Sequence, residues 1–130
     1  MSPRLLVLFN HTLTDAQTAD ARQSLGADEI LEPPPAVKQL WAEIPPDIEG
    51  LDDYVAPVRA WLAGTAVLGD YVLIQGDFGA TCLLVRFALE VGLIPVYSTT
   101  RREATETLQP DGTVELTHRF GHVRFRAYGG

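Results

Sequence analysis

Polar residues of the kinds that bind phosphate gather in three short segments of the sequence. The first is Asn10-His11-Thr12, the second runs from Gln75 to Thr81 (QGDFGAT), and the third runs from Ser98 to Arg102 (STTRR). Arginine pairs with phosphate oxygens through two parallel N–H bonds, and glycine lets a ligand approach backbone N–H groups closely. Hydroxyl and amide side chains can orient such a ligand. Together the three segments predict a phosphate site that requires no metal.

The second segment contains Asp-Phe-Gly, the triplet that holds magnesium in protein kinases. A kinase also needs a glycine-rich loop, a strand lysine and a His-Arg-Asp loop upstream of the triplet, and the sequence has none of them. Apolar residues lead into the segment and a helical pattern follows it. The segment is therefore expected to be a strand-to-helix turn, where backbone N–H groups can face an anion.

Several of these residues also have a purely structural explanation. His11 and Thr12 can equally cap the first helix, and Gly76 and Gly79 can serve only a tight turn. The hydroxyl of Thr81 can bond back to its own helix instead of facing a ligand. The sequence leaves these alternatives open.

Other kinds of site find little support. A dinucleotide fingerprint would follow the first strand, where FNHTLT stands instead, and both a Walker loop and the G-x-S-x-G elbow of a serine hydrolase are missing. His118 and His122 are four residues apart, but they are expected to flank a hairpin turn, so no metal site is predicted. The sole cysteine, Cys82, excludes an intrachain disulfide and is expected in the core.

Composition indicates one globular domain over residues 1–130. The chain is 46% hydrophobic and 21% charged, and no apolar run approaches the roughly 20 residues of a membrane span. The N-terminal apolar run is short for a signal peptide, so a cytoplasmic protein is expected. A net charge of −7 argues against binding duplex nucleic acid. Five arginines nevertheless lie in residues 101–130, which suits a small anionic ligand held in a pocket.

Hydrophobic patterning predicts an α/β fold with an open, mostly parallel sheet, helices on both faces and a C-terminal β-hairpin. Thr14 and Gln17 form a capping-box signal for the first helix, and Pro-Asp-Gly marks the hairpin turn. In such sheets ligands bind at the carboxyl ends of the strands, where all three polar segments are expected. Strands are expected within 4–10, 28–34, 71–75, 94–100, 103–109 and 113–120, and helices within 14–25, 35–46, 51–62 and 78–92.

Five blocks of the sequence, taken together, closely resemble one of the small CRISPR-associated Csx families found beside type III systems. The blocks are LLVLFNHTLTDAQ, LWAEIPP, GDYVLIQGDFGAT, GLIPVYSTTRREA and HVRFRAY. These families are similar to Rossmann-like sensor domains that bind cyclic oligoadenylates, and several act as ring nucleases. The resemblance implies metal-independent and cofactor-independent opening of cyclic tetra-adenylate, in which a ribose 2′-hydroxyl attacks the adjacent phosphorus to give a 2′,3′-cyclic phosphate and switch off signalling.

The resemblance also implies roles for the polar segments. His11 is the expected acid or base, because histidine exchanges protons near neutral pH, with Asp77 second and Arg101 stabilising phosphate charge. Phe78 or Tyr97 is expected to stack on adenine. The remaining expected ligand contacts are Asn10, Thr12, Gln75, Gly76, Gly79, Thr81, Ser98, Thr99, Thr100 and Arg102.

Symmetry of the implied ligand adds a further expectation. Cyclic tetra-adenylate has two-fold symmetry, so an isologous homodimer with the ligand on its axis is predicted. The alternative to a nuclease is a module that binds or sequesters the cyclic nucleotide without cleaving it, since both need the same contacts. A more remote alternative is an α/β domain for another nucleotide.

Overall fold

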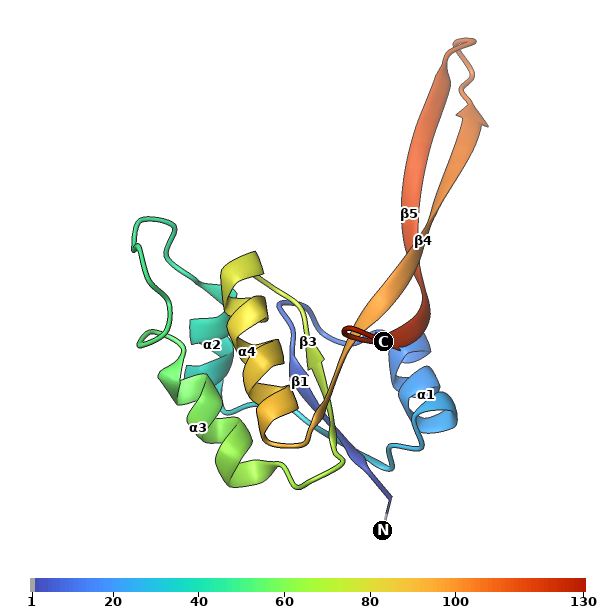
Figure 1. Cartoon of the computed structure of the whole chain (residues 1–130). Helices are drawn as coiled ribbons and strands as arrows, with labels where there is room; N and C mark the ends of the chain where they lie inside the picture. Colours follow the sequence, from blue (N-terminus) through green and yellow to red (C-terminus); the bar gives the residue numbers. More distant parts are fainter. Residues whose placement is uncertain (1) are drawn as a thin grey trace.

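A computed structural model describes residues 2–130, and its elements follow the predicted order (Figure 1). The five strands form one sheet in the order β2-β1-β3-β4-β5, with β1 to β4 parallel and β5 antiparallel to β4. This confirms the predicted α/β class with a C-terminal hairpin. The elements are β1 (Arg4–Leu8), α1 (Asp15–Ser24), β2 (Glu29–Leu31), α2 (Pro35–Ala42), α3 (Ala56–Thr65), β3 (Tyr71–Ile74), α4 (Phe78–Glu90), β4 (Ile94–Leu108) and β5 (Val114–Ala127).

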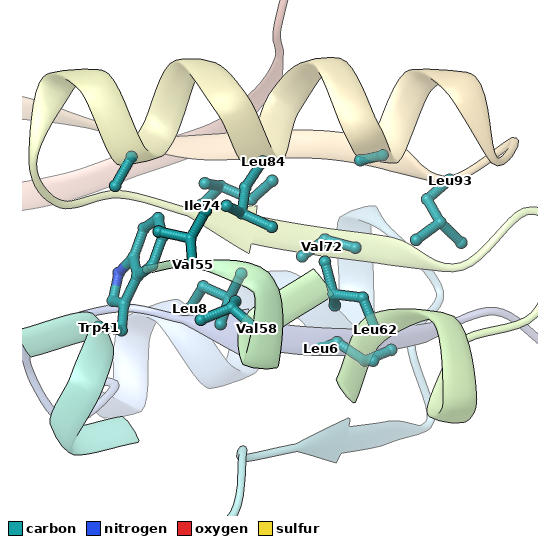
Figure 2. Packing of buried hydrophobic residues seen from close by; sticks show 12 residues of the cluster. Leu6, Leu8, Trp41, Val55, Val58, Leu62, Val72, Ile74, Leu84 and Leu93 are labelled. Carbon is teal, nitrogen blue, oxygen red and sulfur yellow. The ribbon is translucent and has the colours of Figure 1, made fainter. Parts of the chain in front are cut away.

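The sheet is buried on both faces because apolar side chains alternate between them along β1 and β3. Leu6, Leu8, Val72 and Ile74 pack against α2, α3 and α4, as Figure 2 shows. The intervening residues of the same strands, together with Val96 and Phe125, pack on the opposite face, where Ala21 brings in α1. Helices therefore cover both faces, as the continuous apolar runs predicted.

Helix limits agree with the prediction except in α3. The capping box of α1 is present: Gln17 N donates to Thr14 Oγ1 (3.2 Å) and Thr14 N donates to Gln17 Oε1 (2.9 Å). Helix α3 begins at Ala56, five residues later than expected, with Pro57 in its first turn. Proline lacks an N–H group and is tolerated only in that first turn, which explains the later start.

Cys82 is exposed, so its predicted place in the core is wrong. The buried positions of α4 are Ala80, Leu84 and Ala88, four residues apart along one face of the helix. Cys82 follows Ala80 by two residues and lies on the other side. Among residues 2–130 no helix is long and apolar enough to cross a membrane.

The C-terminal hairpin is longer than the sequence indicated. Two separate strands were expected, within 94–100 and 103–109. The structure has a single strand instead, β4, which pairs with β5 as far as Leu108 and Val114. Residues 101–121, which we call the arm, project away from the rest of the molecule (Figure 1). His118 and His122 lie within β5, so the prediction that they flank the turn is wrong.

Candidate functional site

The carboxyl ends of β1, β3 and β4 meet at one edge of the sheet, which we call the carboxyl edge. Leu8 pairs with Ile74 and Leu73 pairs with Val96, so the residues that follow each strand are neighbours. Two hydrogen bonds tie these strand ends together. Gln75 N donates to the Leu8 carbonyl (3.0 Å), and Ser98 N donates to Gln75 Oε1 (2.8 Å). The structure thus brings the second and third polar segments into direct contact.

Asp77 is the N-cap of α4. Its Oδ2 accepts a hydrogen bond from Ala80 N at 3.0 Å, which places a carboxylate at the helix end that was expected to face an anion. Phe78 follows it and is 94% exposed, so its ring is free to stack on a base. The Thr81 hydroxyl is buried and finds no partner within residues 2–130, so it does not bond back to its own helix.

Gly76 is required by the side chain of Trp41. A Cβ atom at Gly76 would lie 2.9 Å from Trp41 Nε1, closer than real Cβ contacts allow. The same indole N–H donates to the Gln75 carbonyl at 3.0 Å and so holds the strand end. Gly79 is less constrained, because its nearest neighbour would be the flexible side chain of Leu51 at 3.2 Å. Close packing with Trp41 therefore accounts for Gly76 without a ligand.

Beside this turn lies a chain of hydrogen-bonded polar side chains, which runs from buried Ser98 and Gln17 to half-buried Asp20 and exposed Ser24. Ser98 Oγ is 2.5 Å from His122 Nδ1, and His122 Nε2 is 2.7 Å from Asp20 Oδ2. Gln17 Nε2 donates to Ser98 Oγ at 3.3 Å, and Ser24 Oγ donates to Asp20 Oδ1 at 2.5 Å. Only 4% of the His122 side chain is exposed. We call Ser98, His122 and Asp20 the relay.

The carboxylate of Asp20 is the charged end of the relay. Burial raises the pKa of Asp20, but hydrogen bonds from Ser24 and His122 outweigh burial and leave the pKa below its ordinary value. Asp20 is therefore ionised at neutral pH, and a carboxylate can only accept hydrogen bonds.

A β-bulge turns His122 toward Asp20. Thr99 pairs with Arg124 and Thr100 with His122, so Val123 is an extra residue in β5. His122 and Phe125 are three residues apart, so without the bulge strict alternation would place them on opposite faces. With it, both rings lie on the α1 face, 4.6 Å apart. Val123 itself is 45% exposed, whereas Phe125 is buried.

The first polar segment lies exposed at this edge. Asn10, His11 and Thr12 are all exposed, and the His11 ring packs edge-on against Phe9 with centroids 5.2 Å apart. Thr14 caps α1, so the helix does not use His11 or Thr12 as its cap. Nothing in the structure joins this segment to the relay by a hydrogen bond among the described residues.

The third polar segment continues from the carboxyl edge into the arm. Arg101 and Arg102 are neighbours on one strand, so their side chains leave opposite faces and do not form a joint clamp. Arg102 Nε donates to His118 Nδ1 at 3.2 Å, and Arg101 is exposed. Thr99 Oγ1 bonds the backbone of Arg124 on β5, and Thr100 is exposed.

Tyr97 is held within the protein. Its ring lies 4.9 Å from that of Tyr128, and its hydroxyl accepts a hydrogen bond from Arg126 Nη1 at 3.0 Å. The Tyr128 hydroxyl in turn donates to the Ile74 carbonyl. Of the two aromatic residues expected to stack on adenine, Phe78 is therefore the one with a free face.

Two hollows in the surface lie away from the carboxyl edge. One of about 620 Å³ surrounds Arg4 and Asp70 at the opposite end of the strands, and one of about 390 Å³ lies beside Arg59 and Arg86. Neither includes a predicted site residue. Within residues 2–130 no group of three or more histidine, cysteine or acidic side chains could hold a metal.

Sequence reasoning missed Gln17, Asp20, Trp41 and His122 as parts of this region. Asp20 and His122 are 102 residues apart, so no spacing motif could link them. The missing nucleophile elbow argued against a serine hydrolase. The structure nevertheless contains a Ser-His-Asp chain of hydrogen bonds, formed by Ser98, His122 and Asp20. The only available signal was a histidine and a serine near the ends of two strands expected to be adjacent.

Comparison with known proteins shows one family over almost the whole chain. Residues 3–126 match the family described as "Uncharacterized protein MJ1673 family". A relative from Methanocaldococcus jannaschii, named "Uncharacterized protein MJ1673", is 46% identical over 126 residues, which cover 97% of each chain. No solved structure matches the chain. The chain belongs to the MJ1673 family.

Proposed function

We propose that this protein is a ring nuclease that binds cyclic tetra-adenylate and opens it without a metal, which would switch off type III CRISPR signalling. The observation that supports it is the meeting of Gln75 and Ser98 at one edge of the sheet, with exposed Phe78 three residues after Gln75 and exposed Arg101 three residues after Ser98. An aromatic face, a cation and polar groups at this edge suit a nucleotide with its phosphate. The open α/β sheet is compatible with a Rossmann-like nucleotide-binding domain.

Positioning would carry most of the catalysis. The protein has to hold a ribose 2′-oxygen in line with the P–O5′ bond, and correct alignment alone is worth several kcal/mol. Arg101 would stabilise the charge on the phosphorane, as preorganised cations do. His11, exposed at the same edge, remains the candidate acid or base, with Asp77 as a second candidate once its bond to Ala80 is released.

Sequestration without cleavage is the second candidate. The carboxylate of Asp77 is engaged by Ala80 N and is therefore not free to act as a base. Occupation of this acidic group favours binding over chemistry. The same adenine and phosphate contacts would then hold the intact ring.

The first prediction is cleavage in EDTA. Purified protein incubated with cyclic tetra-adenylate and EDTA should give linear products ending in 2′,3′-cyclic phosphate, identified by chromatography and mass spectrometry. Arg101→Ala should weaken binding about 10- to 100-fold, because charged hydrogen bonds contribute about 1.5–3 kcal/mol. Arg86→Ala, an exposed arginine on α4 away from the edge, is the matched control.

Other results would separate the candidates. Intact ligand that co-elutes with the protein would favour sequestration. Intact ligand with no binding would be evidence against both readings and would direct attention to other nucleotides.

The proposal includes a homodimer, and the arm offers a surface for it. One face of the arm is polar, whereas the other collects apolar side chains that are not covered by any part of residues 2–130. Phe120 is 69% exposed, Leu116 54%, Leu108 74% and Val114 58%.

An isolated two-stranded hairpin is marginally stable in water, so a partner that covers the arm would stabilise it. Cross-strand pairing puts these residues on one face in the rungs Arg102–Phe120, Ala104–His118, Glu106–Leu116 and Leu108–Val114.

A second copy of the chain is the partner that this face fits. Arg102 and Glu106 lie on it as well as the apolar residues, so the face carries both signs of charge that a self-complementary interface needs. The arm holds three arginines against four acidic residues and is nearly neutral, whereas the whole chain has a net charge of −7. Contact through the arm therefore avoids most of the repulsion between two acidic bodies.

The second prediction concerns oligomeric state. Wild-type protein should elute as a dimer in size-exclusion chromatography with light scattering. Phe120→Glu should raise the dimer dissociation constant at least tenfold, because it would bury a carboxylate in the interface. Thr117→Glu adds the same charge on the polar face of the same strand and should leave the dimer intact. A monomeric wild-type protein, with and without cyclic tetra-adenylate, would contradict the dimer.

A further inference from the structure

We propose that Ser98, acting through His122 and Asp20, takes the proton from the attacking ribose 2′-hydroxyl. The inference rests on the proposed function and names the general base of that reaction. It replaces His11 in that role with a residue from the third polar segment, supported by two residues that the sequence did not predict as part of the site.

When His122 is neutral, the hydrogen bonds of the relay have one consistent direction. Ionised Asp20 can only accept, so the proton on His122 lies on Nε2, 2.7 Å from the carboxylate. The other ring nitrogen of neutral histidine, Nδ1, is then an acceptor. Gln17 Nε2 donates to Ser98 Oγ, so the proton of the Ser98 hydroxyl points to His122 Nδ1 at 2.5 Å.

This direction is the one that activates a hydroxyl group. In Ser-His-Asp sites the hydroxyl donates to a histidine nitrogen whose other nitrogen donates to a buried carboxylate. Here the two ring nitrogens exchange places, since Ser98 contacts Nδ1 and Asp20 contacts Nε2. The carboxylate stabilises the imidazolium that forms when the proton arrives.

Ser98 is the member of the relay that contacts Gln75 at the carboxyl edge. It lies in β4 two residues past Val96, the last residue paired with β3, its backbone N–H donates to Gln75 Oε1, and the residue as a whole is 6% exposed. His122 and Asp20 lie behind it toward α1. His122 is therefore a positioning residue that acts through Ser98.

The step balances with no added reactant. The 2′-O–H proton passes to Ser98 Oγ while the proton of Ser98 passes to His122 Nδ1. The 2′-oxygen forms its bond to phosphorus, the P–O5′ bond breaks, and the 5′-oxygen takes a proton from water. His122 then returns its proton to solvent through Ser98, which restores the neutral relay and leaves a 2′,3′-cyclic phosphate with a free 5′-hydroxyl.

The first test reads the proton position in the wild-type protein, without substrate. Nitrogen-15 NMR of the imidazoles, with His122 assigned by its loss in His122→Gln, should show the proton of His122 on Nε2 and an unprotonated Nδ1. A proton on Nδ1 of neutral His122 would overturn the proposal, because Ser98 could then not hand its proton on. This result does not depend on nuclease activity.

The second test measures cleavage of cyclic tetra-adenylate in EDTA. Ser98→Ala and His122→Gln should each lower kcat about 10²–10⁴-fold while the Kd for the ligand changes little, and the double variant should be no slower than either single one. Asp20→Asn should also lower kcat, whereas Asp28→Asn, an exposed aspartate just after α1, should not.

The outcomes separate this inference from the proposed function. A wild-type protein that does not cleave overturns both. Cleavage with undiminished kcat in folded His122→Gln overturns the relay alone and returns the role of base to His11. If His122→Gln fails to fold, the proton position in the wild-type protein and the kcat of Ser98→Ala decide the matter.

Discussion

Asp70→Asn should lower the free energy of unfolding by about 3–5 kcal/mol, as expected when one partner of a buried ion pair is removed. Asp70 is 2% exposed at the amino end of β3. Its Oδ2 accepts from Arg4 Nη2 (2.9 Å), Arg4 Nε (3.2 Å) and Val67 N (3.0 Å), and its Oδ1 accepts from Arg4 N (3.1 Å). An asparagine would turn an amide against some of these donors and leave Arg4 without its counter-charge. Urea unfolding at neutral pH measures the difference.

The Arg4–Asp70 ion pair also makes the difference in unfolding free energy between wild type and Asp70→Asn depend on pH. Burial raises the pKa of Asp70, but hydrogen bonds from Val67 and Arg4, together with the charge of Arg4, leave that pKa below its ordinary value of 3.8. A carboxyl group with a lowered pKa in the folded state stabilises the protein above its unfolded pKa, and this stabilisation is lost as pH falls through the folded pKa. The difference between wild type and Asp70→Asn should therefore be constant from pH 7 to about pH 5 and narrow below about pH 4.

Asp111→Asn provides the control. Hydrogen bonds from the Thr113 hydroxyl and N–H lower the pKa of Asp111 as well, but this carboxylate is fully exposed in the turn of the arm. Solvent screens such groups, so the substitution should leave global unfolding nearly unchanged. An equal loss in both variants would contradict the assignment of the stability to the buried pair.

Trp41→Ala should lower the free energy of unfolding by about 3–5 kcal/mol, the usual cost of truncating a buried tryptophan. Trp41 is 2% exposed and packs in the cluster between α2, α3 and the sheet, near Val55 and Leu8 (Figure 2). The cavity would lie directly under Gly76, whose missing side chain makes room for the indole. Denaturant unfolding followed by circular dichroism measures the loss.

Trp41→Phe separates packing from the hydrogen bond. It keeps much of the apolar volume but leaves the Gln75 carbonyl without its donor, which should cost about 1–3 kcal/mol. Because this bond holds the strand end at the carboxyl edge, the affinity for cyclic tetra-adenylate should fall as well. Trp61→Phe, at a half-buried indole on α3, is the matched control and should leave affinity unchanged. Full affinity in Trp41→Phe would show that the indole does not support the site.

Local patterns in the sequence predicted most elements because each depends on near neighbours. The Thr14–Gln17 capping box starts α1, and continuous apolar runs mark strands buried on both faces. The meeting of the polar segments at one edge also follows from strand direction alone. The apolar spacing predicted that α3 begins at residue 51, five residues too early. Pro57 can lie only in the first turn of a helix, and this constraint on the backbone determines where α3 begins.

The role of single residues at the edge required the tertiary structure. Gly76 was attributed to a turn or a ligand, whereas an indole 35 positions earlier in the chain requires it. Asp77 was predicted as the second candidate acid or base, and only the structure shows that its carboxylate also caps α4. Such functions depend on which side chain occupies the adjacent space, and spacing in one sequence carries no information about that.

By itself, the sequence determined the fold class, the capped first helix and the edge at which polar groups gather, since helix and strand periods are local properties. Only the tertiary structure decided that the β5 bulge aims His122 at Asp20 and Ser98, and that the last two strands extend into an arm with one apolar face. The physical reason is that one extra residue in a strand reverses every side chain beyond it, and that reversal depends on cross-strand pairing.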